Sequence, residues 1–222
     1  RGSILRILKD FPVSLDINHL NELLRVKANS SRYERLYELI ETAKGIARPK
    51  AVYIRANVDS ADEEGTVING VCFKSSTLKS SLENVKRVFP YVATCGNEIE
   101  DWGIDNESVL EQFWIENIKQ FVLVDAINTL MNDIGITYET GRLTALNPGA
   151  LSGWPISDQE PLFSLIGDVN GLIGVSLKKS MMLSPTKSVS GIIYDSKSDC
   201  EDCAFCAKKN CEKRKTAFDP TL

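Results

Sequence analysis

Four of the six cysteines lie close together near the end of the sequence, at Cys200, Cys203, Cys206 and Cys211. Their spacing is C-x2-C-x2-C-x4-C, and short gaps of this kind let successive sulfurs and backbone N–H groups face one point. Thiolates gathered in this way are typical ligands of a metal centre. We therefore predict a four-cysteine metal site in a tail that covers residues 195–222.

Three kinds of chemistry compete for this site. A 4Fe–4S cluster takes four cysteines with short gaps, although its common motif closes with three residues and a proline, where this one closes with four residues and Glu212. Structural zinc also takes four cysteines, but usually as two pairs joined by a longer spacer. Disulfides need an oxidising compartment, which nothing else in the chain indicates. The spacing favours a metal, and iron over zinc.

The composition excludes several classes of function. The 222 residues carry 26 Lys and Arg against 30 Asp and Glu, and this net charge of −4 argues against a general nucleic-acid binder. No apolar run approaches the roughly 20 residues that span a bilayer, and the first residues lack a signal-peptide core, so we expect a cytoplasmic protein. His19 is the single histidine, which excludes sites built on histidine pairs. No nucleophile-elbow motif supports a Ser-His-Asp triad.

A second candidate site lies in a segment rich in glycine and proline, residues 141–155. Glycine lets backbone groups approach a ligand closely, and loops on a rigid scaffold often carry binding groups. The predicted cofactor-binding residues of this loop are Asn147, Pro148, Gly149, Gly153 and Trp154. Trp154 is explained equally well as a core residue that anchors the loop. Ser188 and Ser190 are candidates for the same cleft, or for a purely structural strand start.

Apolar spacing predicts the helices that must position these sites, at about residues 16–24, 31–47, 106–132 and 157–166. Ser31 with Glu34 forms a capping-box pattern, and Ser108 and Ser157 begin similar ones. The helix at 106–132 is apolar on all sides in its middle, so we expect it to be buried and to end by Gly135. Asp125 falls in that apolar stretch and needs either a structural partner or a place in a site.

Short apolar or alternating runs predict strands at residues 51–58, 67–73, 88–94, 172–177 and 189–194. Cys72 and Cys95 lie in apolar contexts and are predicted to be buried, reduced thiols. The fold class is therefore α+β, with several short strands, one long buried helix and few βαβ repeats.

A further set of motifs runs from residue 94 to residue 194. It comprises the turn at 93–99, the helix segment 123–126, the loop 147–149, the pieces 153–156 and 162–163 with Gln159, and S-M-M-x-x-P-x-x-S-V-S-G at 180–191. Together these motifs resemble the activation domain of cobalamin-dependent methionine synthase, and the last one is the most specific. The chain is similar to the freestanding, single-domain branch of that family, some members of which have a cysteine-rich C-terminus.

The resemblance implies a twisted antiparallel sheet with flanking helices over residues 1–194, followed by the cysteine-rich tail. In methionine synthase this domain binds S-adenosylmethionine, docks on the cobalamin domain and supports reductive methylation of cob(II)alamin. The present chain is too short to carry the other domains of that enzyme. The resemblance therefore implies an accessory protein that acts on a separate corrinoid protein or methyltransferase.

One departure from the family concerns S-adenosylmethionine. The family's binding loop reads R-x-x-x-G-x-Y or R-x-x-P-G-Y, with the arginine and tyrosine contacting the ligand. Here Pro148 and Gly149 remain, but the arginine and tyrosine positions are Ala145 and Ala150. Arg142 is a candidate replacement for the arginine. Because a guanidinium that pairs with a carboxylate contributes strongly to binding, the departure counts against S-adenosylmethionine as a ligand.

Three functional hypotheses follow. In the first, the protein docks on a corrinoid protein and supports reduction of cob(II)alamin through an iron–sulfur cluster, since such clusters reach very low potentials. In the second, it is a non-catalytic interaction subunit whose zinc only folds the tail. In the third, it is a free-standing S-adenosylmethionine-dependent enzyme, against which the lack of a glycine-rich dinucleotide motif also counts.

Overall fold

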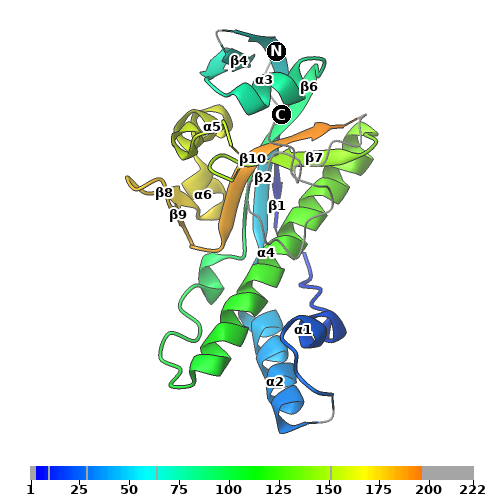
Figure 1. Cartoon of the computed structure of the whole chain (residues 1–222), viewed down its shortest axis with the longest axis vertical. Helices are drawn as coiled ribbons and strands as arrows, with labels where there is room; N and C mark the ends of the chain where they lie inside the picture. Colours follow the sequence, from blue (N-terminus) through cyan, green and yellow to red (C-terminus); the bar gives the residue numbers. More distant parts are fainter. Residues whose placement is uncertain (1–3, 10, 29, 64, 151, 197–222) are drawn as a thin grey trace.

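The computed structural model describes residues 4–9, 11–28, 30–63, 65–150 and 152–196, and Figure 1 shows how its elements are arranged. The strands are β1 (Leu5–Leu8), β2 (Lys50–Ile54), β3 (Ala56–Asp62), β4 (Gly65–Ile68), β5 (Val71–Phe73), β6 (Arg87–Thr94), β7 (Leu143–Leu146), β8 (Ser176–Leu177), β9 (Leu183–Ser184) and β10 (Ser188–Asp195). The helices are α1 (Ile17–Leu23), α2 (Ser31–Ile46), α3 (Ser76–Leu82), α4 (Val109–Tyr138), α5 (Gln159–Ile166) and α6 (Val169–Ile173), with 3-10 turns η1 (Asn97–Ile99) and η2 (Ile156–Asp158). This mixture confirms the α+β fold class.

The antiparallel sheet is built around β6. Along one edge of β6 runs β10, in a register that pairs Ser188 with Thr94 and Tyr194 with Val88. Along the other edge lie β2 and then β3, which follow each other in the chain. The sheet continues to β7 beyond β10, to β1 beyond β2, and to β4 and β5 beyond β3. The first residues of β10 and the loop after β7 are thereby held at the same part of the sheet.

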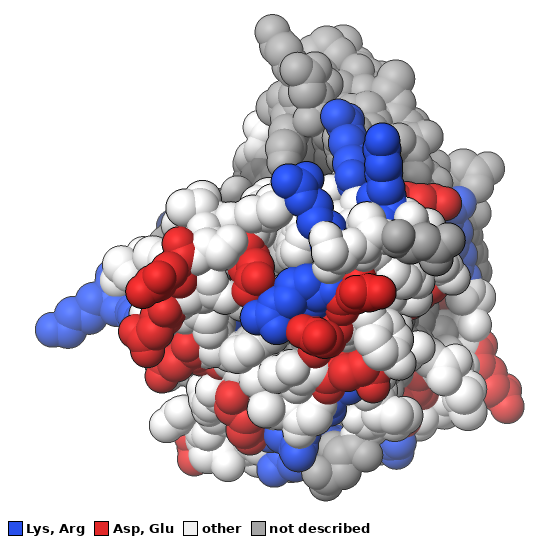
Figure 2. Space-filling view, turned by 90° about the horizontal axis from the view of Figure 1, so that it is seen from below, with Lys and Arg blue, Asp and Glu red and all other residues white. Residues whose placement is uncertain are grey.

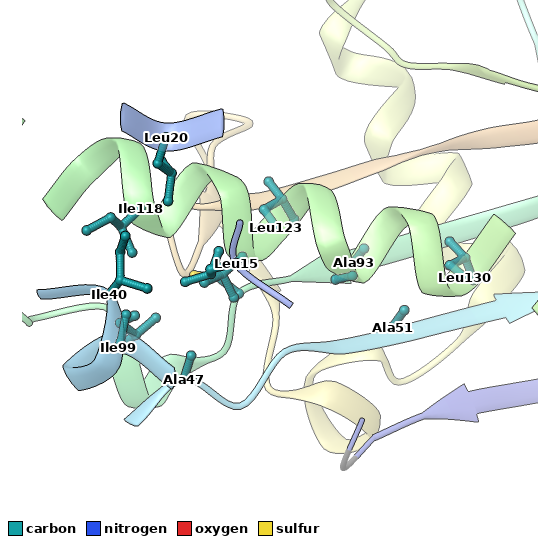
Figure 3. Close-up of a cluster of buried hydrophobic side chains, with 14 of the residues drawn as sticks. Leu15, Leu20, Ile40, Ala47, Ala51, Ala93, Ile99, Ile118, Leu123 and Leu130 are labelled. Carbon is teal, nitrogen blue, oxygen red and sulfur yellow. The ribbon is translucent and has the colours of Figure 1, made fainter. Parts of the chain in front are cut away.

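Helix α4 covers one face of the sheet, and α1 and α2 pack beside its N-terminal part, beyond the end of the strands (Figure 1). The long helix α4 buries side chains at intervals of three and four residues, among them Trp114, Ile118, Val122 and Leu130. Figure 3 shows side chains of α4 packed over Ala51 and Ala93 of the sheet. The sequence-based prediction of one long helix with a buried middle is therefore confirmed. No helix in the described parts of the chain has the length and apolar character needed to cross a membrane.

Helices α3, α5 and α6 cover the opposite face. Because successive strand residues point to opposite faces, Ala51 and Tyr53 pack under α4 while Val52 and Ile54 pack under the other helices. Among the described residues of the 141–155 segment, the second core contains Leu146 and Trp154. The two cores therefore share the same strands.

Three of the predicted strands differ from the structure. The run at 51–58 is divided into β2 and β3 at Arg55, whose backbone N–H donates to the Ile4 carbonyl (3.1 Å). The run at 67–73 is a hairpin that turns at Asn69 and Gly70, both of which have positive φ. The run at 172–177 begins inside α6, and only its last two residues form the short strand β8.

Helix ends also differ in detail. Ser30, not Ser31, caps α2, with its Oγ accepting from the Tyr33 N–H (3.2 Å). Helix α4 continues through Gly135 and ends at Glu139, which adopts a left-handed conformation. Ser108 caps α4 as predicted, whereas no side chain caps α5, so the cap predicted at Ser157 is wrong.

Asp125 has a structural partner rather than a place in a site. Its Oδ2 accepts from the Ser14 backbone N–H at 2.8 Å, which ties the segment before α1 to α4.

Candidate functional site

The candidate site lies where the loop after β7, the start of β10 and the first turn of α5 meet. Asn147 follows β7 directly, Ser190 is the third residue of β10, and Gln159 begins α5. These residues are far apart in sequence and come together because β10 lies between β6 and β7 in the sheet.

Asn147 is the centre of this polar cluster. Its Nδ2 donates to the Tyr91 hydroxyl oxygen (2.8 Å) and to the Ser190 carbonyl (2.9 Å). The amide therefore joins the loop to both β6 and β10. A Cβ on Gly191 would come into conflict with the Leu146 carbonyl and with this amide, so glycine at that position is what allows the close approach.

Ser190 and Gln159 extend the cluster toward the β8–β9 hairpin. The buried Ser190 hydroxyl donates to Gln159 Oε1 (3.0 Å), and Gln159 Nε2 donates to the Met181 carbonyl (2.6 Å). Ser188 lies apart from these contacts, since its hydroxyl donates to Thr94 Oγ1 (2.9 Å). The structure thus brings Asn147 of the 141–155 segment into contact with Ser190, and the two were predicted to share a cleft. Ser188 lies instead beside Thr94, at the end of β6.

Trp154 is a core residue. Its side chain is 1% exposed, and its Nε1 donates to Asp158 Oδ2 at 3.1 Å. Burial raises the pKa of the Asp158 carboxyl, although the hydrogen bond from Trp154 opposes that shift. Of the two explanations for Trp154, the structure supports the loop anchor rather than a side chain free to stack on a ligand.

The two glycines of the loop are exposed and have positive φ, 79° at Gly149 and 81° at Gly153. The Gly149 N–H donates to the Trp154 carbonyl (2.9 Å), and the Thr77 hydroxyl donates to the Ser152 carbonyl. Pro148 is half-buried beside them. These hydrogen bonds hold the described residues of the loop at the surface, next to the Asn147 cluster.

The positions where the family carries arginine and tyrosine have no replacement in this loop. Ala145 lies in β7, opposite Ile193 of β10, and Ala150 is exposed. Arg142 precedes β7, five residues before Asn147, which corresponds to about 16 Å along an extended strand. Arg142 is thus at the other end of the strand from the candidate site.

The predicted metal ligands Cys200, Cys203, Cys206 and Cys211 lie outside the described residues. Within the residues that are described, no group of three or more His, Cys, Asp or Glu side chains could hold a metal ion. Cys95 is buried as predicted, and burial together with the Glu100 carboxylate raises the pKa of its thiol to about 12. Cys72 is exposed on β5, so the prediction of a buried thiol there is wrong.

A separate groove of about 380 Å³ lies between the segment before α1 and the end of α2. Phe11, Pro12 and Val13 form one side, and three cations lie along the other. Lys44 pairs with Glu41, Lys50 pairs with Glu98, and the Arg48 guanidinium donates to the carbonyls of residues 45 and 47. All three cations of the groove therefore already have partners inside the protein.

Sequence reasoning did not single out Tyr91 or Met181 as parts of the site. Tyr91 lies in the apolar run of β6, and only its pairing with Gly191 in the neighbouring strand places its hydroxyl beside Asn147. Met181 contributes a backbone carbonyl, which no side-chain pattern could reveal. Gln159 was part of the motif set, but its bridging role is visible only in the structure.

Comparison with known proteins gives a likeness in structure. The sequence matches no family model and no curated protein. The structure is similar to a crystal structure of the MetH reactivation domain bound to AdoHcy, with a TM-score of 0.56 and 12% sequence identity. The likeness covers 86% of this chain and 78% of that domain. At this level of identity it shows a shared fold, which includes the antiparallel sheet and flanking helices that the family resemblance implies.

Proposed function

We propose that the chain is an accessory protein of corrinoid-dependent methyl transfer of the methionine synthase type. In this proposal it docks on a separate cobalamin-binding protein or methyltransferase and supports reductive reactivation of cob(II)alamin. The observation that carries the proposal is the likeness to the MetH reactivation domain over most of both chains. The motifs at 94–194 support the same relation independently, because they are features of the sequence alone.

The four cysteines supply the second half of the proposal. We assign Cys200, Cys203, Cys206 and Cys211 to a 4Fe–4S cluster, with zinc as the alternative metal. A cluster held there would give one electron to cob(II)alamin to form cob(I)alamin, and a one-electron donor of low potential would reduce the cluster again. This source of electrons would suit a protein that lacks the family's arginine and tyrosine for S-adenosylmethionine.

The first experiment measures iron, sulfide and zinc per chain in protein purified without oxygen. The reduced protein is then mixed with cob(II)alamin bound to a corrinoid protein, and cob(I)alamin is followed by its absorption spectrum. We expect about four irons and four sulfides per chain, and formation of cob(I)alamin. A Cys203→Ser/Cys206→Ser variant should lose both, whereas Cys72→Ser, at an exposed cysteine outside the cluster, should keep both.

Two results would overturn parts of this assignment. One zinc and no iron would make the tail structural and leave an interaction subunit as the function. A loaded cluster that leaves cob(II)alamin unchanged would remove the electron-transfer role.

A second candidate function, an activator that binds S-adenosylmethionine, is favoured by one observation. The exposed residues Gly149, Ala150, Ser152 and Gly153 lie in the same loop as Asn147 of the polar cluster, and the structurally similar domain is bound to AdoHcy. Titration calorimetry with S-adenosylmethionine and AdoHcy tests this candidate. Binding of S-adenosylmethionine that is weakened at least about tenfold by Ala150→Lys, which places a positive charge on the exposed loop near a cationic ligand, would support it. No heat of binding with either compound would exclude it and leave the redox proposal standing.

A further inference from the structure

The N-terminal end of α4 carries an exposed apolar patch. Val109, Leu110 and Phe113 occupy the first two turns, and their exposed fractions are 78%, 42% and 56%. Residues four apart lie on the same face of a helix, so Val109 and Phe113 are neighbours, with Leu110 beside them. Ile104, 64% exposed, lies in the loop that leads into the helix. We call Ile104, Val109, Leu110 and Phe113 the α4 tip.

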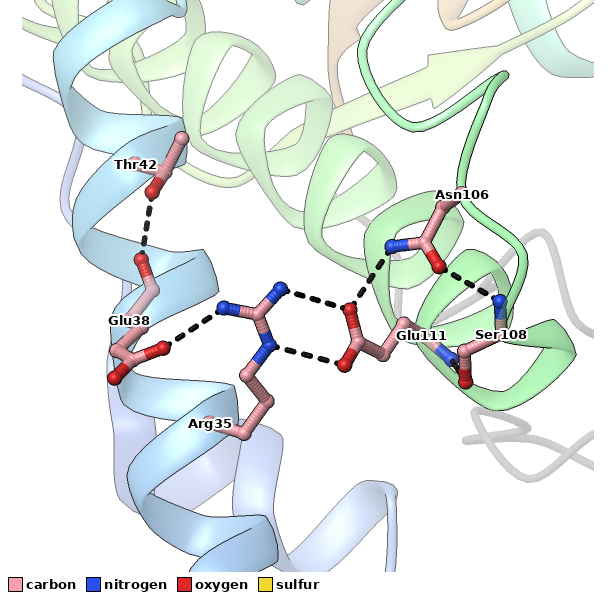
Figure 4. A network of polar contacts seen from close by, with 6 residues as sticks. All are labelled: Arg35, Glu38, Thr42, Asn106, Ser108 and Glu111. Atoms are coloured by element: carbon pink, nitrogen blue, oxygen red, sulfur yellow. Dashed lines mark hydrogen bonds and ion pairs between the residues drawn. The ribbon is translucent and has the colours of Figure 1, made fainter.

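The α4 tip is held in a defined position. The Arg35 guanidinium of α2 donates to both carboxylate oxygens of Glu111, each at 2.9 Å, and also to Glu38 (Figure 4). Asn106 Nδ2 donates to the same Glu111 carboxylate, and Asn106 Oδ1 accepts from the Ser108 N–H. The Ser108 hydroxyl in turn caps the helix. Bidentate pairs of this kind fix geometry as well as charge, so the apolar side chains are presented on a rigid support.

Acidic side chains flank the α4 tip. Asp101, Asp105 and Glu107 are exposed in the loop before α4, and no Lys or Arg of the described residues forms an ion pair with them. Figure 2, which views the molecule from below, shows acidic side chains on this face together with Lys and Arg side chains and uncharged surface. Arg35, which contacts the start of α4 through Glu111, is already paired with Glu111 and Glu38.

We propose that the α4 tip is a docking site for a basic, amphipathic segment of another protein. Apolar side chains of that segment would cover Val109, Leu110 and Phe113, and its lysines or arginines would face Asp101, Asp105 and Glu107. An apolar centre with a charged rim is the usual anatomy of a protein interface, and complementary charge selects the partner and speeds its approach. The α4 tip is formed by different elements from those of the Asn147 cluster. The docking proposal is therefore independent of the proposed redox function.

The experiment measures binding of two labelled peptides to the whole protein by fluorescence anisotropy. The first peptide, of about 18 residues, has leucines on one helical face and lysines on the other, and the second has glutamate in place of each lysine. We expect the lysine peptide to bind and the glutamate peptide to bind at least about tenfold more weakly. Val109→Ser/Phe113→Ser should weaken binding of the lysine peptide at least about tenfold, whereas Ile136→Ser, which removes an equally exposed apolar side chain of α4, should not.

A second pair of variants distinguishes the effect of the acidic residues beside the α4 tip from the effect of the protein's net charge. Asp105→Asn/Glu107→Gln should weaken binding of the lysine peptide several-fold. Glu83→Gln/Glu139→Gln makes the same change in net charge at exposed positions at the C-terminal ends of α3 and α4, and should leave binding unchanged. The proposal would be overturned if both double charge variants weakened peptide binding equally. It would also be overturned if the lysine peptide bound the Val109→Ser/Phe113→Ser variant as tightly as the natural protein. Sedimentation of the peptide-free protein provides the remaining test. A dimer that the same apolar variant dissociates would overturn the proposal in favour of a second copy of this chain.

Discussion

At the scale of single residues, the polar groups of the candidate site satisfy one another. Both donors of the Asn147 amide have acceptors inside the protein, and Gln159 bridges a hydroxyl and a carbonyl. Buried polar groups are costly to leave unpaired, so a ligand would have to replace these contacts or bind beside them. Accordingly, the exposed residues Gly149, Ala150, Ser152 and Gly153 are the part of the site best placed to receive a ligand directly.

A second residue-scale feature is the cluster of Arg6, Tyr53 and Asp133 between β1, β2 and α4. Arg6 donates to both oxygens of Asp133 (3.0 and 2.7 Å), and the Tyr53 hydroxyl donates to Oδ2 (2.6 Å). Burial alone would raise the pKa of the Asp133 carboxyl, but the hydrogen bonds from Arg6 and Tyr53 outweigh it and lower that pKa.

This lowered pKa predicts a specific dependence of stability on pH. A carboxyl with a lower pKa in the folded state adds stability above its unfolded pKa of about 3.9, and this contribution is lost as the pH falls through the folded pKa. We expect Asp133→Asn to be less stable than the natural protein at pH 7, with the difference in unfolding free energy shrinking below about pH 4. Urea titrations from pH 7 to about pH 2.5 measure this difference. Asp105→Asn, the same change at an exposed carboxylate in the loop before α4, serves as the control. A difference between Asp133→Asn and the natural protein that stays constant over the whole pH range would contradict the prediction.

At the scale of elements, β10 is the strand that assembles the site. It contacts β6 along one edge and β7 along the other, and it carries Ser190 and Gly191 at the crossing point. A Cβ at Gly191 would meet the Leu146 carbonyl, Asn147 Nδ2 at 2.5 Å and Tyr91 Cε1 at 3.0 Å. Two of these three neighbours are backbone or buried groups that cannot move far.

We therefore expect Gly191→Ala to destabilise the protein by about 1–3 kcal/mol, because β7 and its loop must shift away from β10. The matched control is Gly45→Ala in α2, where a Cβ would have open space and helix propensity should add roughly 0.5–1 kcal/mol of stability. Urea unfolding of both variants checks the signs. A Gly191→Ala protein as stable as the natural one would show that this crossing point is looser than the structure indicates.

At the scale of the whole molecule, the two cores lie on opposite faces of shared strands. Neighbouring residues of β2 alternate between them, and Ile192 and Ile193 of β10 do the same. Neither set of helices can lose its packing without exposing one face of the common sheet. This arrangement predicts cooperative unfolding of the whole domain.

Truncation in either core should therefore shift one common transition. We expect Leu130→Ala under α4 and Leu162→Ala under α5, both fully buried, each to lower the unfolding free energy by about 2–5 kcal/mol. Circular dichroism and tryptophan fluorescence should follow a single transition in both variants. Two separated transitions in one of them would contradict the prediction and indicate that the faces unfold independently.

The sequence by itself determined the helices in which buried side chains recur at regular intervals. Spacing of three and four residues identified α2 and α4, and Leu36, Leu39 and Ile40 are buried as that spacing requires. It also determined the motifs that resemble the activation domain, whose fold the structure shares at 12% identity. Such signals are local, since each depends only on residues within a few turns or a few strand positions.

Tertiary structure decided where segments distant in sequence meet. Ser30 and Ser31 have equal capping chemistry, and only the position of the α2 backbone selects Ser30. The Arg55 backbone N–H donates to the Ile4 carbonyl, and the partners of Asn147 lie 56 and 43 residues away. The physical reason is that the spacing of apolar residues along the chain decides which face of a helix or strand is buried. Which residues of distant segments come into contact depends instead on the register between strands, and on a glycine where two segments approach closely.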